Sequence, residues 1–546
     1  MAEKKNVNAM HENLLDRDSN SFWTKWRTLN QKSSSIVSRI DGETDEKGIS
    51  DAFATHFESV YGGHNSPQHV TLKDKFHDAF SKYYGEHISD DISSFYLTRN
   101  DMMSIAAKIK VGKASAGVIR PEHFLQGSSC LMGHFTILFN AMIQHGVVPT
   151  DFLKGKISPI VKDSNGDVSS TKNYRGITLS SLPAKLFEYA IQIKTSKYLK
   201  TDDLQFGFKG KTSTSHALYS LDSTVNYFNR NGSSVFVSFL DCTKAFDRIS
   251  HYGLFSKLID RGFPLCLLLC LIYWYLNMTA AVKWGSEMSR EFYVPLGIKQ
   301  GGINSPDFFS VYFDDLMRIL RKRGIGCHIG KTFLASLFFA DDICLLAPTR
   351  SALQRLIDCC SDYCKEFTLD FNPKKSKVII FSKKRIDTDL LCPIQMNGIP
   401  VDFVDSVKYL GITLVSKPTL SYTAENDLRS FYRSANSILN VINGPNEIIM
   451  MHLLYANCVP ILTYGSAIKQ FPSREMTSCN TALNDAIRKI FSFHRWESVR
   501  TLRESFGYKS LIELFEQSRR SFLLSLRSHP NSALRFLSHL DSFTDP

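Results

Sequence analysis

Residues 337–347 read LFFADDICLLA, with Asp341 and Asp342 between two short apolar runs. Upstream, the run VFVSFL at residues 235–240 ends in Asp241. Apolar runs of this length predict central strands that are buried on both faces, and an Asp pair between two such runs predicts a tight hairpin. The sequence therefore places three carboxylates where central strands reach the surface.

Around these runs, short β-type segments alternate with helical patterns from about residue 97 to 415, which is typical of a mixed α/β fold. Thr98 and Asp101 form a predicted cap for an amphipathic helix that ends at Lys110. Beyond about residue 422 the pattern is helical. The predicted helices of this tail are residues 424–441, 481–493 and 511–527.

The composition is that of a folded protein with several lobes, because 546 residues are too many for one core and 43% of them are hydrophobic. Lys and Arg number 65 against 53 Asp and Glu, and the net charge of +12 favours a polyanionic partner. Residues 154–211 hold 11 of the cations and 5 of the acids, and residues 374–385 hold six cations and no acid. The positive charge is therefore concentrated in two segments.

The twelve cysteines include no CxxC pair and no Cys/His set at zinc spacing, which indicates reduced thiols in an intracellular protein, nuclear or cytoplasmic. The first 18 residues lack the apolar stretch of a signal peptide. The most apolar run, Leu265–Leu276, is shorter than the ~20 residues that a bilayer requires. We therefore expect a buried helix there and no membrane partner.

Three carboxylates close together would raise one another's pKa unless a cation lay between them, and Mg²⁺ prefers oxygen ligands. Two such ions about 4 Å apart can hold the attacking and leaving oxygens of a phosphoryl transfer. An isolated Asp-Asp pair would be interpreted as ordinary turn residues. The segments around it decide against that interpretation.

Seven segments follow one another along the chain. They are KISPIVKDSNGDVSSTKNYRGITL at 156–179, QFGFKGKTSTS at 205–215, FLDCTKAFDR at 239–248, PLGIKQGGINSP at 295–306, FFADD at 338–342, LDFNPKKSK at 369–377 and VKYLGITL at 407–414. In this order they resemble the reverse transcriptases of non-long-terminal-repeat (LINE-type) retrotransposons. The resemblance runs from about Thr98 to Leu414 and continues more weakly to about Arg520.

The resemblance implies a right-hand polymerase with mixed α/β fingers and palm, built on an antiparallel sheet with helices, over residues 96–415. A helical thumb and a helical C-terminal region would follow at 416–546, and residues 1–95 would be an N-terminal extension or linker. The implied reaction is two-metal nucleotidyl transfer from a deoxynucleoside triphosphate to the 3′-oxygen of a DNA primer on an RNA template. The sequence leaves the oligomeric state open.

Among the implied site residues, Asp241, Asp341 and Asp342 are the catalytic residues and the ligands of two Mg²⁺ or Mn²⁺ ions. Phe246 would be the aromatic gate that excludes a ribose 2′-hydroxyl, although a buried core ring remains an open alternative. Asp247 would be a structural hydrogen-bond acceptor.

The nucleotide-binding residues come from other segments. Lys162 and Arg175 would meet the triphosphate, since an ammonium and a guanidinium fork suit phosphate oxygens. Gln300 and the flexible Gly301 would line the nucleotide and template, and Lys375 is a possible general acid for the departing pyrophosphate. Without the surrounding motifs, solvated cations and a simple glycine turn would be the alternatives.

Two further segments would contact the nucleic acid. Leu410 and Gly411 would form the primer grip around the primer end. Residues 205–215 contain Gly210, Lys211 and Thr212 and so imitate a P-loop, but Gln205 stands where a P-loop requires its first Gly. The implied role of this segment is template contact.

Some positions depart from the family pattern. KASAGVIR at 113–120 lacks the Asp and the following Gly of the family's turn, and Asn304 and Asp307 stand where the family commonly has Leu. These changes indicate a diverged or decaying copy, so the alternative is a catalytically inactive, retroelement-derived RNA-binding protein. A metal-dependent nuclease is a third hypothesis, but it leaves the fingers and Gln300 motifs unexplained. We recognise neither endonuclease module of such elements in this sequence.

Overall fold

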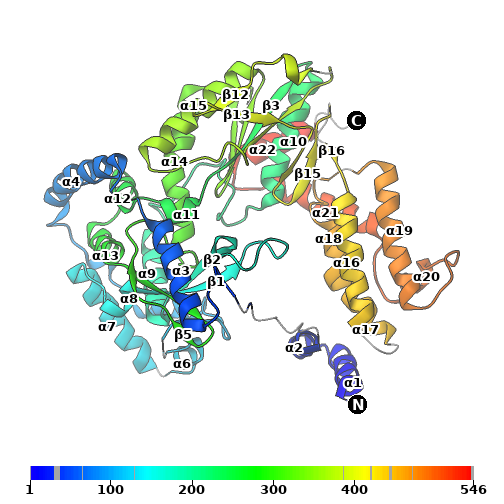
Figure 1. Ribbon diagram of the computed structural model, residues 1–546, viewed down its shortest axis with the longest axis horizontal. Coiled ribbons are helices and arrows are strands. Elements are labelled where there is room, and N and C mark those ends of the chain that lie inside the picture. The colour runs from blue at the N-terminus through cyan, green and yellow to red at the C-terminus, as the bar shows by residue number, and fades with distance from the viewer. Residues whose placement is uncertain are drawn as a thin grey trace.

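The computed structural model describes residues 2–29, 37, 39–63, 65–117, 119–127, 129–384, 386–417, 421–441, 446–469 and 471–542. Val118 of the KASAGVIR segment and Arg385 of the second basic segment lie outside the described residues. In Figure 1 one sheet with its helices lies at the top, a second sheet with its helices lies at the lower left, and a group of helices lies at the right.

The upper sheet contains the strands that the apolar runs predict. Its strand order is β12-β13-β11-β3-β10-β9. The bounds are β3 Val235–Asp241, β9 Ser336–Phe339, β10 Asp342–Ala347, β11 Lys377–Phe381, β12 Ile394–Met396 and β13 Ile399–Phe403. β3 is buried up to Leu240 and has an antiparallel partner on each side, which confirms it as a central strand.

The prediction that all three apolar runs form central strands is wrong for β9, which ends the strand order. Its outer edge is covered by residues 204–206 instead of another long strand. Phe206 N donates to the Phe338 carbonyl (2.8 Å), and Phe338 N donates to the Leu204 carbonyl (2.9 Å). This cover explains why a strand at the end of the sheet is as apolar as a central one.

Helices pack around this sheet, and α10 and α15 lie against β3. The predicted buried helix at 265–276 is confirmed as α13. The helices between residues 214 and 366 are α10 Thr214–Arg230, α11 Ala245–Arg248, α12 His251–Asp260, α13 Leu265–Leu276, α14 Ser305–Arg323 and α15 Arg350–Glu366. Of these, α12 and α13 lie at the left in Figure 1, with the helices of the second sheet. A small hairpin, β7 His328–Ile329 with β8 Thr332–Phe333, connects α14 to β9.

The second sheet is built on the hairpin of the first basic segment, and its order is β2-β1-β4-β5, with β6 also paired to β4. The strands are β1 Lys154–Val161, β2 Tyr174–Leu179, β4 Thr279–Trp284, β5 Glu287–Met288 and β6 Phe292–Tyr293. The surrounding helices are α3 Glu46–Tyr61, α4 Pro67–His87, α5 Arg99–Ala106, α6 Pro121–Gln126, α7 Ser129–His145, α8 Thr150–Leu153 and α9 Leu182–Thr195.

The cap predicted for α5 is confirmed, because Thr98 and Asp101 form a capping box. The helix ends at Ala106, however, and not at Lys110 as predicted. The backbone N–H groups of Lys108 and Ile109 reach back only three residues, to Ile105 and Ala106. These bonds tighten the last turn and end the α-helix.

The C-terminal part begins with a small sheet of β14 Ser406–Tyr409, β15 Ile412–Val415 and β16 Ser421–Tyr422, and is then helical as predicted. The predicted helices at 424–441 and 511–527 are confirmed, whereas the middle one begins eight residues early. The helices are α16 Glu425–Val441, α17 Glu447–Leu453, a π-helical turn Leu454–Cys458, α18 Val459–Thr463, α19 Ser473–Ile490, α20 Arg500–Ser505, α21 Leu511–Arg527 and α22 Ser532–Ser542.

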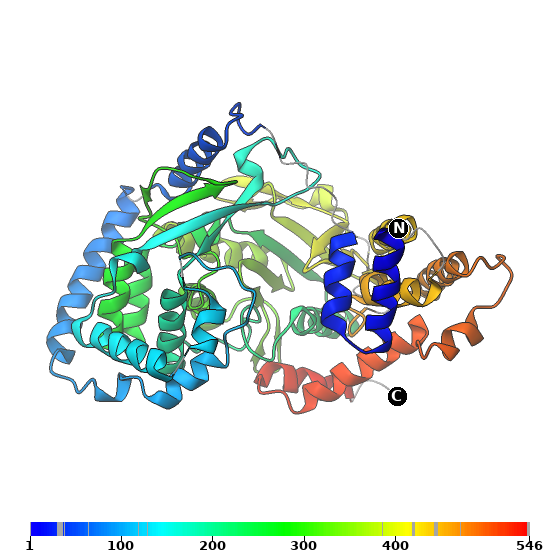
Figure 2. The same ribbon diagram turned by 90° about the horizontal axis from the view of Figure 1, so that it is seen from below.

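The buried apolar residues of the described chain form two cores. The larger one joins both sheets and their helices, including α3 and α4, and it also takes in Leu534 and Leu537 of α22. The smaller core holds α16 to α19 together with α1 Ala2–Leu15 and α2 Ser19–Leu29, through Met10, Phe22 and Trp26. Figure 2 shows α1 and α2 beside the orange helices and the red C-terminal helix returning beneath the main body. The first 95 residues therefore contribute to both cores.

The mixed α/β class, with a largely antiparallel sheet and a helical C-terminal region, is confirmed. All twelve cysteines are unpaired, and only Cys130 and Cys392 are exposed. Among the helices that the structure describes, none combines the length and the apolarity needed to cross a membrane.

Candidate active site

Asp241 is the last residue of β3, and its backbone is held from both sides. β10 pairs with β3 so that Asp342 lies directly opposite Asp241. On the other side, Asp241 N donates to Ser376 Oγ (3.2 Å), and the Asp241 carbonyl accepts from Asn372 N (2.9 Å). Strand register therefore brings two of the three predicted carboxylates to the same end of the sheet.

Asp341 lies in the two-residue turn that joins β9 to β10, which confirms the predicted hairpin. Ala340 has a φ of +57°, a left-handed conformation that residues with a Cβ rarely adopt. The side chains of Asp341 and Asp342 reach solvent at this turn. The hairpin thus holds two adjacent carboxylates beside Asp241.

The three carboxylates interact electrostatically. Desolvation by the surrounding protein, followed by the charges of Asp341 and Asp241, raises the pKa of Asp342 to about 6. Desolvation also raises the pKa of Asp341, with a further contribution from the Asp241 charge. The pKa of Asp241 is raised by desolvation too. The site therefore disfavours three negative charges in the absence of a cation.

Within the described part of the chain, no three His, Cys, Asp or Glu side chains gather closely enough to form a ready-made metal site. The three carboxylates nevertheless supply only oxygen donors, and they repel one another. A divalent cation would relieve this repulsion, and a hard ion such as Mg²⁺ prefers oxygen ligands. The residues present therefore fit such an ion.

Two predicted cations face the carboxylates. Arg175, an exposed residue of β2, lowers the pKa of Asp341 in opposition to its desolvation. Lys375 lies three residues after Asn372, whose N–H donates to the Asp241 carbonyl. The charge of Lys375 lowers the pKa of Asp241 in opposition to its desolvation. Positive charge from two separate segments is therefore close enough to act on the acidic residues.

Lys162 belongs to the same basic group. It follows β1, and its ammonium donates to the Lys172 carbonyl (3.0 Å). Its pKa is lowered by desolvation and by the charges of Lys244, Arg175 and Lys375, against the opposing charge of Asp247. Three other cations therefore act on Lys162, and this repulsion favours an anionic ligand.

Gln300 and Gly301 lie against β2. Gln300 Nε2 donates to Asp247 Oδ1 (2.8 Å), and the Gln300 carbonyl accepts from Thr178 N (2.8 Å). A Cβ at Gly301, whose φ is +114°, would lie 3.0 Å from the Thr178 carbonyl oxygen, so a glycine suits this position. Asp247 is thus a hydrogen-bond acceptor, as predicted.

Phe246 is half-buried. Its ring stacks on Phe309, with the centroids 4.2 Å apart and the planes within 10°, and Phe208 meets it edge-on at 5.8 Å. A half-buried ring is compatible with both expectations for this residue. It can be a gate beside the nucleotide or a ring packed in the core.

The predicted primer grip forms the turn between β14 and β15. Leu410 and Gly411 both have positive φ, of 45° and 80°, as a two-residue hairpin turn requires. Tyr464 OH donates to the Leu410 carbonyl (3.0 Å), so the helical region holds this turn. The Tyr409 ring packs on Phe239 of β3 at 4.5 Å. No motif in the sequence indicates this role for Tyr464.

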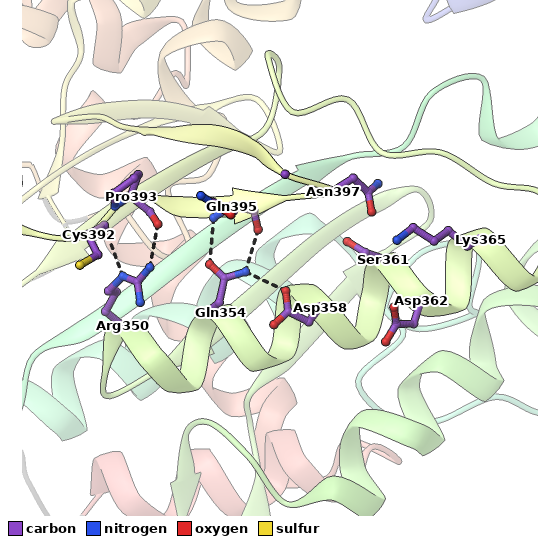
Figure 3. Close-up of a pocket in the computed structure, with 11 residues that line it drawn as sticks. Arg350, Gln354, Asp358, Ser361, Asp362, Lys365, Cys392, Pro393, Gln395 and Asn397 are labelled. Atoms are coloured by element: carbon purple, nitrogen blue, oxygen red, sulfur yellow. Dashed lines mark hydrogen bonds between the residues drawn. The ribbon is translucent and has the colours of Figure 1, made fainter.

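A groove of about 510 Å³ lies between α15 and the segment around β12 (Figure 3). Arg350 donates to the Cys392 and Pro393 carbonyls (2.7 Å each), and Gln354 pairs with both backbone groups of Gln395. None of the predicted site residues lines this groove. Its polar side chains hold β12 against α15.

The chain is similar in sequence to a known protein family and to several known proteins. Residues 160–414 match the family model described as reverse transcriptase (RNA-dependent DNA polymerase). The probable RNA-directed DNA polymerase from transposon BS of Drosophila melanogaster is 26% identical over 352 residues, which cover 61% of this chain and 38% of that protein. The RNA-directed DNA polymerase from mobile element jockey of the same species is 22% identical over 416 residues, 73% of this chain and 44% of that protein.

A solved telomerase structure from Candida albicans, in complex with a fragment of telomeric RNA, has a TM-score of 0.37 and 11% identity, covering 90% of this chain and 95% of that one. This chain spans less than half the length of the two transposon polymerases. The family match and these relatives confirm the resemblance to the reverse transcriptases of non-LTR retrotransposons.

Proposed function

From the reverse transcriptase domain that the chain carries at residues 160–414, we propose that the protein is an RNA-directed DNA polymerase of the non-LTR retrotransposon type. In the proposed reaction, the 3′-oxygen of a DNA primer attacks the α-phosphate of a deoxynucleoside triphosphate on an RNA template, and pyrophosphate leaves. The observation that carries the proposal is the register of β3 and β10, which sets Asp342 opposite Asp241 with Asp341 in the adjoining turn.

Asp241, Asp341 and Asp342 would hold the divalent ions, two Mg²⁺ or Mn²⁺. Such ions, when bound, lower the pKa of the attacking oxygen and neutralise the charge that develops on the phosphate. The chain contributes carboxylates fixed at the end of a hydrogen-bonded sheet. Because they are fixed before the ligands arrive, little reorganisation is needed during the reaction.

Arg175 and Lys162 would bind the triphosphate oxygens, the first with a guanidinium fork and the second as a compact charge. Lys375 lies close enough to lower the pKa of Asp241. From that side of the site its ammonium would donate a proton to the departing pyrophosphate oxygen. The cluster of cations would thereby neutralise the leaving group.

Gln300 and Gly301 would line the base-pairing nucleotide, since their backbone lies directly against β2. Phe246, fixed by its stacking on Phe309, would exclude a 2′-hydroxyl by volume. The turn at Leu410 and Gly411 would bracket the primer end.

For the whole chain, we propose fingers and palm at residues 96–415, and a thumb and C-terminal region at 416–546. Residues 1–95 would form an extension whose helices join both cores. The basic segments would bind the RNA template and DNA primer through the phosphate backbone, with marked salt dependence. The unpaired thiols support an intracellular location.

The test is extension of a labelled DNA primer on an RNA template, with Mg²⁺ and all four deoxynucleoside triphosphates, by the wild type and by Asp341→Ala. We expect extension by the wild type alone. Binding of the primer-template without extension, in Mg²⁺ and in Mn²⁺, would reject the polymerase.

One observation favours the catalytically inactive RNA-binding protein instead. Asn304 is 2% exposed, and neither its amide nitrogen nor its amide oxygen has a partner among the described residues. An unpaired buried amide costs stability, as expected of a decaying copy. Under this alternative the wild type would bind RNA with strong salt dependence and add no nucleotide.

A further inference from the structure

Gln205 lies beneath the turn that carries Asp341. It is 2% exposed, and it forms an isolated parallel bridge with Phe338 of β9. The backbone bonds of Leu204 and Phe206 to Phe338 extend the sheet by one short segment. The residues from 204 to 207 are therefore part of the palm sheet and not a free loop.

The Gln205 side chain supports the turn itself. Its Oε1 accepts from Gly207 N (3.0 Å) and from Ala340 N (3.2 Å). Ala340 is the residue with left-handed φ that immediately precedes Asp341. An acceptor for its N–H stabilises an otherwise unfavourable backbone conformation. The oxygen of Gln205 is thus committed inside the protein.

The backbone at Gly207 fits tightly against the same turn. A Cβ at Gly207 would lie 2.2 Å from Ala340 N, 2.9 Å from Phe339 C and 3.0 Å from Ala340 Cα. All three atoms are backbone, so no side-chain rotation could make room. The two segments therefore pack as one unit, in which neither can shift alone.

The far side of this segment is held by the C-terminal region. Ser532 donates to Asp203 Oδ2 through its N (3.0 Å) and its Oγ (2.7 Å), and His529 Nε2 is 2.8 Å from the Lys211 carbonyl. Residues 203–211 are thus fixed between the catalytic hairpin and the start of α22. Because contacts hold this segment on both sides, it can support the turn at Ala340 and Asp341 rigidly.

We propose that Gln205 and Gly207 position Asp341 by fixing the 340–341 turn, and that this, rather than template contact, is the role of Gln205. The proposal rests on the proposed polymerase function. Gln205 touches no reacting atom in it and is a positioning residue. Loss of its acceptor would let the turn relax and would move the Asp341 carboxylate away from Asp241.

The experiment compares two substitutions with two matched controls. Gln205→Met removes the acceptor at similar volume, and Gly207→Ala inserts the Cβ that meets Ala340. The controls are Gln205→Glu, which keeps an acceptor oxygen, and Gly85→Ala, since a Cβ at this exposed glycine of α4 meets no atom within 4 Å. Each protein is measured for primer extension against Mg²⁺ concentration, and for Mn²⁺ affinity by electron paramagnetic resonance without nucleotide.

We expect Gln205→Met and Gly207→Ala to lower kcat about 10- to 100-fold and to raise the half-saturating Mg²⁺ concentration several-fold, at unchanged KM for primer-template. Mn²⁺ affinity should fall in the same two variants. Gly85→Ala should stay within about twofold of the wild type, and Gln205→Glu should retain more activity than Gln205→Met. If Gln205→Met does not fold, Gly207→Ala against Gly85→Ala decides.

The proposal is overturned if Gln205→Met keeps the wild-type kcat and metal dependence, or if only the KM for primer-template rises, which would indicate template contact. An inactive wild type would reject the polymerase function but not this inference. In that case the Mn²⁺ affinities decide. Weaker binding by Gln205→Met than by Gly85→Ala supports the positioning role, and equal binding overturns it.

Discussion

The acidic and the basic residues of the candidate site are held in different ways. Asp241 and Asp342 belong to paired strands, and Asp341 lies in a turn that Gln205 supports through Ala340 N. The cations Lys162, Arg175 and Lys375 are exposed side chains of hairpins and loops.

The acidic and the basic parts of the site therefore differ in what holds them in place before a ligand binds. The positions of the carboxylates depend on backbone hydrogen bonds, which a polar substitution leaves intact. The charged groups of the cations lie at the ends of longer side chains with more rotatable bonds, so their positions depend less on the backbone. Substitutions in the acidic part should therefore change the rate of the chemical step, and those in the basic part should change nucleotide binding.

The largest effect is expected for Asp241→Asn, which should lower the rate of primer extension at least about 10³-fold. The fold should remain, because the strand and its hydrogen bonds to Ser376 and Asn372 use the backbone. Rapid-quench measurement of single-nucleotide addition tests this. Asp362→Asn, an exposed carboxylate on α15, is the control. A residual rate above a tenth of the wild type would exclude Asp241 from the catalytic set.

Arg175→Lys should raise the KM for deoxynucleoside triphosphate about tenfold and leave kcat within a few-fold. The substitution keeps the charge near Asp341 but loses the bidentate fork. Steady-state kinetics with varied nucleotide would show it, and Arg355→Lys, at an exposed position of α15, is the matched control. A fall in kcat at constant KM would instead place Arg175 in the transition state.

Asp247 is not among the proposed metal ligands, so a substitution there tests the effect of its carboxyl group on stability. Burial raises its pKa to about 6, against the opposing hydrogen bond from Gln300. Between about pH 4 and pH 6 the folded chain therefore holds more of this proton than the unfolded chain, and stability falls as pH rises through that window. Asp247→Asn removes this dependence and keeps an oxygen that can accept from Gln300.

From pH 4.5 to pH 7.5, Asp247→Asn should gain about 1–2 kcal/mol in free energy of unfolding relative to the wild type. Urea denaturation at both pH values in the presence of a chelator tests this, because the other carboxylates are common to both proteins. A constant difference between the two proteins would show that Asp247 titrates alike in the folded and unfolded states.

The sequence could predict the acidic part of the site because central strands need long apolar runs, and VFVSFL and LFFADDICLLA supply them. It could not predict the register that sets Asp342 opposite Asp241, because register depends on pairing between distant segments. The roles of Lys162 and Arg175 came only from the family resemblance, since exposed cations have no pattern of their own.

Other parts could not be predicted for different reasons. Template contact was assigned to the segment of Gln205 from the family resemblance, whereas the Gln205 side chain is buried beneath a turn 135 residues away. Tyr464 donates a hydrogen bond to the turn at Leu410 and Gly411, but no motif in its own segment indicates this contact. The separation of α1 and α2 from α3 between two cores depends on tertiary packing, because the sequence of each helix does not specify which core it joins.

The smallest effect is expected for Asn304→Leu at the start of α14, and it is a gain in stability. The Asn304 amide is buried without partners among the described residues and makes no capping bond, so removing it should relieve a desolvation cost. Because Leu has a similar volume, we expect a gain of about 1 kcal/mol in free energy of unfolding, with extension within about twofold of the wild type.

Asn304→Ala is the matched control, because it removes the same amide but leaves a cavity and should gain nothing. Urea denaturation of the three proteins measures the difference. A loss of stability in Asn304→Leu would mean that a buried water satisfies the amide. In that case the departure from the family pattern at residue 304 is a compensated substitution, and it no longer favours the inactive protein.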